Sequence, residues 1–166
     1  MADVVYSNVR ELMRQLRAIE PELRKELVRD LKSVAKPVQA AIVNRIPSNP
    51  PLRGMRGNGR MSWDNSVNYK GRRVPAKSVT VKFRSGGSKR AAITSLISVQ
   101  AMSPAVAMLD MARFGHTPQG IAMIRGVGSK ASRYVWPAAE SALPKAEAEA
   151  QRILNAASLK ISRSLS

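Results

Sequence analysis

The sequence predicts an α+β fold in which a long, bent N-terminal amphipathic helix and a C-terminal helix pack on a small antiparallel sheet. Three patterns predict it: aliphatic residues at helical spacing over 7–46, apolar–polar alternation at 79–84 and 97–102, and a second helical pattern after Pro137. The chain has 166 residues, a length typical of one domain, so we expect a single domain over 1–166.

The first helical segment covers residues 7–46. Its apolar residues recur every three or four positions, which places them on one face of a helix. They are Val9, Leu12, Leu16, Ile19, Leu23, Leu27, Leu31, Val34, Val38, Ile42 and Ile46. Pro21 is expected to divide the segment and Pro37 to kink its second part, because proline removes a backbone hydrogen bond. The apolar face keeps its phase through both prolines, which predicts one bent rod.

Residues 48–75 hold no lasting helical or alternating pattern, and we interpret them as an extended basic arm. Long loops in compact domains are usually functional or disordered. Trp63 and Tyr69 either pin the arm to the body of the domain or anchor a partner, since Trp, Tyr and Arg dominate interface hot spots. Deleting 48–73 is expected to leave the fold intact. The candidate partner or DNA contacts are Arg53, Arg56, Arg60, Trp63, Tyr69, Lys70, Arg72 and Arg73.

Two strands and a final helix follow the arm. Val79, Val81 and Phe83 alternate with polar residues, which is typical of a half-buried strand. A Gly-rich turn at 85–88 leads to a return strand within 91–102. We interpret 105–114 as a strand-like or turn-rich segment at a sheet edge, with a short helix as the alternative, and 115–132 as a second irregular loop. The final helix is expected over 137–163, with acids early and bases late, as the helix dipole favours.

The composition excludes several kinds of site. The chain has no cysteine and one histidine, His116, so disulfides, thiolate sites and histidine-rich metal sites are excluded. No spacing joins His116 to a nucleophile and an acid, so no enzyme activity, catalytic residue, metal or cofactor is predicted. Gly126-Val-Gly128 lacks the Lys-Ser/Thr pair and immediate helix of a phosphate loop. No run approaches a membrane span and no signal segment opens the chain, so we expect a soluble intracellular protein.

Positive charge is concentrated in the middle of the chain. The net charge is +17, and residues 31–109 hold fourteen Lys or Arg against one acid, Asp64. This concentration predicts a polyanionic partner, either nucleic acid or an acidic protein surface. A stand-alone basic nucleic-acid-binding protein is therefore one hypothesis, although no helix-turn-helix, zinc-finger or RNA-binding strand motif is present.

Two segments carry a resemblance to a known family. They read Met108-Leu-Asp-Met-Ala-Arg-Phe-Gly-His-Thr117 and, after a variable loop, Arg133-Tyr-Val-Trp-Pro-Ala-Ala-Glu140. This pattern resembles the neck (head–tail connector, or tail-completion) proteins of long-tailed bacteriophages, in which an aromatic-Gly-Thr-like turn precedes a variable loop and an aromatic-x-x-Pro-Ala motif opens the last helix. Arg113 and His116 depart from the usual pattern and leave the subfamily open. The matching residues are Phe114, Gly115, Thr117, Trp136, Pro137 and Ala138.

The resemblance implies a structural ring subunit of the virion neck, assembled in the host cytoplasm. Such a ring joins the DNA-filled capsid, on the portal and adaptor side, to the tail and surrounds the DNA channel. It implies a homo-oligomer, with a hexamer favoured and a dodecamer as the alternative. Neighbouring head-closure or adaptor proteins and tail proteins would be the partners, with non-specific contact to double-stranded DNA. A tail-terminator ring of the same virion is the related alternative.

Overall fold

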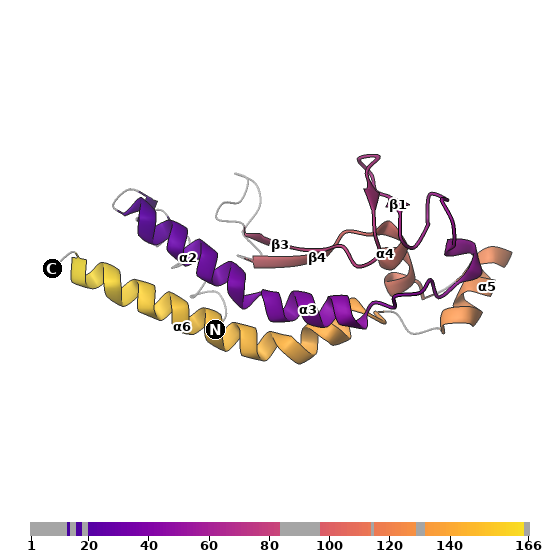
Figure 1. The fold of residues 1–166 in the computed structure, drawn as a ribbon. Coiled ribbons are helices and arrows are strands. Elements are labelled where there is room, and N and C mark those ends of the chain that lie inside the picture. Colours follow the sequence, from indigo (N-terminus) through magenta and orange to yellow (C-terminus); the bar gives the residue numbers. More distant parts are fainter. Residues whose placement is uncertain are drawn as a thin grey trace. The chain divides into compact units, whose positions relative to one another are not determined.

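The computed structural model describes residues 13, 16, 17, 20–83, 97–113, 115–128 and 132–164. The α+β fold is confirmed, with six helical and four strand elements in this part of the chain (Figure 1). β1 and β2 are antiparallel, with Ser66 opposite Val74, and β3 pairs with β4 in a second two-stranded sheet. In order, the elements are α2 (Pro21–Val34), α3 (Lys36–Arg45), the 3-10 helix η1 (Arg53–Met55), β1 (Ser66–Val67), β2 (Arg73–Val74), β3 (Val79–Phe83), β4 (Ile97–Ala101), α4 (Pro104–Met111), α5 (Pro118–Val127) and α6 (Val135–Ser164).

The chain forms two compact units. Unit 1 contains Met1–Pro37, Val81–Ser98 and Pro144–Ser166, and unit 2 contains Val38–Thr80 and Val99–Leu143. Strands β3 and β4 and helix α6 each contribute residues to both units.

Unit 1 is built around an aliphatic cluster. Its buried members come from the N-terminal segment, α2 and α6, and residues of β3, β4 and α6 pack against them. Both expected helices therefore share a core with the small sheet, as the sequence predicted. The buried residues are Met13, Leu16, Leu27, Leu31 and Ala157, and the partly buried ones include Leu23, Phe83, Ile97, Ile153 and Leu154.

The bent N-terminal helix is confirmed as consecutive helices separated at proline positions. Pro21 is the first residue of α2, where its missing N–H needs no partner. Pro37 is the second residue of α3, and the break falls just before it, at Ala35, whose N–H bonds to Lys32 at 3.3 Å. Val38 and Ile42 of α3 are buried, so the predicted apolar face continues beyond the break.

Residues 48–75, which we interpreted as an extended basic arm, contribute buried side chains to unit 2. Met55, Trp63, Ser66 and Val74 are all buried. Their spacing of eight, three and eight residues follows no helical or strand period, so the sequence pattern did not reveal them. Individual backbone bonds hold the loop, including Trp63 N to Met55 O at 2.9 Å and Val67 N to Arg60 O at 3.0 Å. Deleting 48–73 would remove the buried side chains of Met55, Trp63 and Ser66, so we expect the deletion to unfold unit 2.

Two segments expected to be irregular are helices. The strand-like interpretation of 105–114 is wrong, because Pro104–Met111 forms α4, which Ser103 caps by accepting a hydrogen bond from Val106 N at 3.5 Å. The second loop contains α5, which Thr117 caps by accepting from Gly120 N at 3.1 Å. In both cases proline follows the capping residue, a start signal that apolar periodicity does not register.

The remaining boundaries are close to those expected. Strand β3 occupies the predicted position, and α6 begins at Val135, two residues before the expected start. The predicted turn at 85–88 and the start of the return strand at 91–96 lie outside the described residues. Among the described helices, none combines the length and the hydropathy that a bilayer crossing requires.

Candidate functional site

The strongest candidate site is the segment 48–77 of unit 2, which we call the basic loop. Its apolar residues Met55, Trp63 and Val74 are buried, whereas every lysine and arginine in it is exposed. Lys77 Nζ donates to Ser48 Oγ at 2.9 Å and so joins the two ends of the loop. Asp64 is the only acid in the loop. The exposed cations are Arg53, Arg56, Arg60, Lys70, Arg72, Arg73 and Lys77.

Trp63 fixes the loop from inside. Its side chain is 0% exposed, and its indole N–H donates to the carbonyl of Pro47 at 2.9 Å. Its ring meets that of Tyr134 edge to face, with centroids 6.5 Å apart. Of the two interpretations open for Trp63, the structure supports anchoring within the domain, and the ring is not accessible to a partner. Burial raises the pKa of the Tyr134 phenol, Arg133 opposes that rise, and Asp110 adds to it.

Strands β1 and β2 form a hairpin with a closely bonded tip (Figure 1). Asn68 Oδ1 accepts from the backbone N–H groups of Lys70 at 2.9 Å and Arg72 at 3.1 Å. Asn68 also pairs with Arg72 through its own N–H at 2.9 Å, and Gly71 adopts a φ of +71°. Tyr69 is 88% exposed at this tip, and Lys70 Nζ lies 5.5 Å from the centre of its ring.

The base of the hairpin is bonded to α4. Ser66 Oγ donates to Val74 O across the hairpin at 3.0 Å and lies 2.8 Å from Ser103 Oγ. Because a hydroxyl donates once, Ser103 donates in the second bond. Ser103 also caps α4, so one buried pair of serines connects the hairpin to the helix.

The two segments that carry the family resemblance are bonded to each other. Asp110 Oδ1, at the end of α4, accepts from Tyr134 N at 2.6 Å and from Val135 N at 3.3 Å and thereby caps α6. The Arg133 guanidinium donates to carbonyls at the ends of α4 and α5. Its four acceptors are the carbonyl oxygens of Leu109, Ala112, Val127 and Gly128.

The structural roles of Asp110 and Arg133 were not predicted from the sequence. The available signal was that Asp110 interrupts an otherwise apolar run over 105–111. An acid placed there is expected to have a buried partner, because an unpaired buried charge is costly.

The other motif residues have different surroundings. A Cβ on Gly115 would overlap the backbone of Gly120 and Ile121, so only glycine allows this turn to approach α5. Thr117 caps α5, and Ala138 is buried. Trp136 is 61% exposed and Pro137 is half-buried, while Phe114 lies outside the described residues.

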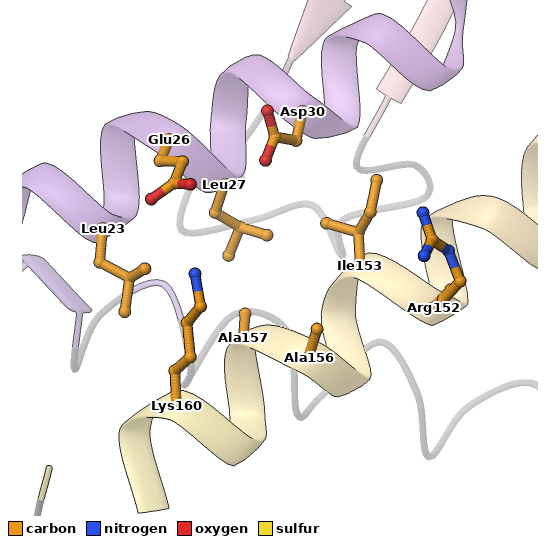
Figure 2. A pocket seen from close by; sticks show the side chains of 9 residues that line it. All are labelled: Leu23, Glu26, Leu27, Asp30, Arg152, Ile153, Ala156, Ala157 and Lys160. Carbon is orange, nitrogen blue, oxygen red and sulfur yellow. The ribbon is translucent and has the colours of Figure 1, made fainter. Parts of the chain in front are cut away.

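Unit 1 contains a groove between α2 and α6 (Figure 2). Leucine, isoleucine and alanine side chains form its floor, acids of α2 lie along one side, and bases of α6 lie along the other. It encloses about 130 Å³, less than the roughly 300–1,000 Å³ of typical small-molecule sites. Its lining residues are Leu23, Glu26, Leu27, Asp30, Arg152, Ile153, Ala156, Ala157 and Lys160.

Within the described residues, no three His, Asp or Glu side chains cluster as a metal site would require. His116 is exposed. No family model matches the chain, and no curated protein or solved structure matches it.

Proposed function

We propose that this chain is a non-enzymatic ring subunit of the neck of a long-tailed bacteriophage, joining capsid to tail around the DNA channel. The observation that carries the proposal is the basic loop, where seven exposed cations are mounted on a segment held by buried side chains. The resemblance of 108–117 and 133–140 supplies the family, and the Asp110 and Arg133 bonds give both segments a structural reason to occur together.

Phosphate contact is the chemistry that the basic loop supports. Lysine and arginine neutralise phosphates without reading sequence, and a protein that surrounds passing DNA needs that kind of contact. Met55 and Trp63 of the basic loop are buried and hold its backbone in place. The exposed cations Arg53, Arg56 and Arg60 therefore project from a fixed backbone.

Ring closure requires contact between two unlike surfaces of the subunit. Unit 2 exposes several large apolar side chains, which we propose as contacts with the next subunit or with neighbouring neck and tail proteins. A hexamer is the favoured ring and a dodecamer the alternative. The exposed residues are Met111, Ile121, Trp136 and Leu143.

Cryo-electron microscopy of the virion, or of the chain co-expressed with its neighbours, tests the proposal. A closed ring of this chain between capsid vertex and tail supports it and gives the stoichiometry. The same map separates a neck ring from a tail-terminator ring by position. A chain found elsewhere in the virion, or absent from it, contradicts the proposal.

Charge reversal tests the role of the basic loop. Changing its five arginines to glutamate should leave the fold intact and block assembly, because their side chains are exposed. The matched control makes the same change in charge at five exposed bases of unit 1 and should assemble. The test residues are Arg53, Arg56, Arg60, Arg72 and Arg73, and the control residues are Arg17, Lys32, Lys36, Lys145 and Lys160.

A stand-alone nucleic-acid-binding protein is the second candidate, favoured by the same exposed cations. Tight duplex binding by the free chain, with affinity that falls steeply as salt rises and with no ring, would favour it.

A further inference from the structure

The tip of the β1–β2 hairpin presents an aromatic ring that the fold does not use. Asn68 and Gly71 supply the side-chain bonds and the positive φ that form the turn. Tyr69 lies between them and is 88% exposed, so its ring gains almost nothing from burial. Folding therefore does not explain an aromatic residue at this position.

The charge around Tyr69 points to a polyanion. Lys70, Arg72 and Arg73 are all exposed, and the sequence contains no acid between Asp64 and Asp110. Lys70 Nζ lies over one face of the Tyr69 ring, 5.5 Å from its centre, which leaves the opposite face for a ligand.

Nucleic acid fits this tip better than an acidic protein does. Aromatic anchors of protein interfaces are surrounded by residues that exclude water. The neighbours of Tyr69 in the turn are Asn68, Lys70 and Gly71, which offer no apolar surround. A nucleotide base needs only the face of a ring for stacking, together with cations for the adjacent phosphates.

We propose that the hairpin tip binds DNA at unpaired bases, with the Tyr69 ring stacked on a base and with Lys70, Arg72 and Arg73 contacting the neighbouring phosphates. The inference deepens the proposed function, on which it rests for the presence of DNA, and assigns a separate task to one part of the basic loop. Duplex bases are already stacked on each other, so binding to duplex depends on the cations alone. Binding to single strands depends on Tyr69 as well.

The test measures fluorescence anisotropy of a labelled oligothymidine and of a labelled duplex of equal length, at one fixed salt concentration. Stacking contributes about 1–3 kcal/mol per base, so Tyr69→Ala should weaken single-strand binding by about 5- to 150-fold. The same variant should change duplex binding by less than about twofold, because it leaves every cation in place. Tyr69→Phe keeps the ring and should bind both as the parent chain does.

Two controls keep the result interpretable. Leu159→Ala removes an exposed apolar side chain of unit 1, to which no contact is assigned, and should leave single-strand binding unchanged. Circular dichroism and thermal unfolding should show that all three variants are folded, since both side chains are exposed.

Several outcomes would overturn the inference. Unchanged single-strand binding by Tyr69→Ala would mean that cations alone hold the DNA. Equal losses in Tyr69→Phe and Tyr69→Ala would assign the effect to the hydroxyl group and not to stacking. Either result leaves the ring proposal standing if a neck ring is seen, whereas the absence of a ring contradicts that proposal whatever Tyr69 does.

Discussion

The carboxylate of Asp110 accepts a 2.6 Å hydrogen bond from the backbone N–H of Tyr134, which lies 24 residues further along the chain. Val135 N donates to the same oxygen at 3.3 Å, and Asp110 itself is 6% exposed. A side chain at the end of α4 thus supplies the cap for the start of α6. The first N–H groups of α6 are therefore capped by a residue distant in sequence, and not by a residue just before the helix.

Replacing Asp110 with alanine should lower the free energy of unfolding by about 1–2 kcal/mol, the usual effect of losing a helix cap. Asp110→Asn keeps an oxygen acceptor and should lose less. Urea denaturation measures both, with Asp64→Ala, at an exposed acid, as the control. Equal stability of Asp110→Ala and the parent chain would show that the bonds to Tyr134 and Val135 contribute nothing.

Replacing Arg133 with lysine should also destabilise the protein. Lysine keeps the charge but cannot reach the carbonyl acceptors of two helix ends with one planar group. The expected loss is about 1.5–3 kcal/mol, since hydrogen bonds to charged groups have roughly that net value. Hydrogen exchange should quicken in α5, whose last carbonyls Arg133 holds. Arg125→Lys, on the exposed side of α5, is the control and should behave like the parent chain.

The two tryptophans should respond oppositely to truncation. Trp63→Ala removes a fully buried ring and should cost about 3–5 kcal/mol of stability. Trp136→Ala removes a ring that is 61% exposed and should change stability by less than about 1 kcal/mol. Thermal and urea unfolding compare them directly. A loss of stability in Trp63→Ala as small as that in Trp136→Ala would mean that the buried Trp63 ring does not hold the basic loop.

Glycine at 115 should be irreplaceable where glycine at 54 is not. Alanine at 115 would force its Cβ into the backbone of Gly120 and Ile121, so α5 must shift or unfold. Alanine at 54 meets no atom within 4 Å. We expect Gly115→Ala to lose at least about 2 kcal/mol of stability, in the range of strained or overpacked sites. Chemical-shift changes confined to residue 115 itself would contradict this expectation.

Stability should fall at alkaline pH in part through Tyr134. Its pKa is raised chiefly by burial, so the folded state holds the phenol proton more tightly than the unfolded state does. This contribution is complete below the unfolded pKa of about 10 and is lost as pH rises through the folded pKa. Between about pH 9 and pH 11, Tyr134→Phe should therefore lose less stability than the parent chain. Tyr69→Phe, at an exposed ring, is the matched control.

Periodic features of the fold could be read from the sequence, and irregular ones could not. Leu27, Leu31 and Ile42 follow the helical period, so burial of one face was predictable. Met55 and Trp63 lie in a loop whose backbone bonds are satisfied one by one, and no period marks such residues. For α4 the apolar run fitted strand and helix equally, and the Ser103-Pro104 cap decided the outcome.

The candidate site was predictable in its charge but not in its construction. The lysines and arginines within 53–73 are exposed because charged groups stay in water, so their choice as candidate contacts required no knowledge of the fold. The bonds of Arg133 to α4 and α5 depend on where two distant helix ends meet, and no local spacing encodes that. Both Tyr69 and Trp63 are aromatic, so the sequence could not show which is an internal anchor and which is exposed to a partner. Only their burial in the structure distinguishes the two roles.

The hairpin tip also determines when conformational entropy is lost. Asn68 holds the backbone of Lys70 and Arg72, and Gly71 closes the turn, so the peptide around Tyr69 is ordered as soon as the chain folds. When a partner binds this tip, only side-chain rotations are still to be restricted, and the free-energy cost is about 0.5–1.5 kcal/mol per immobilised side chain. The larger loss of backbone conformational entropy, about 1–2 kcal/mol per residue, has already occurred during folding.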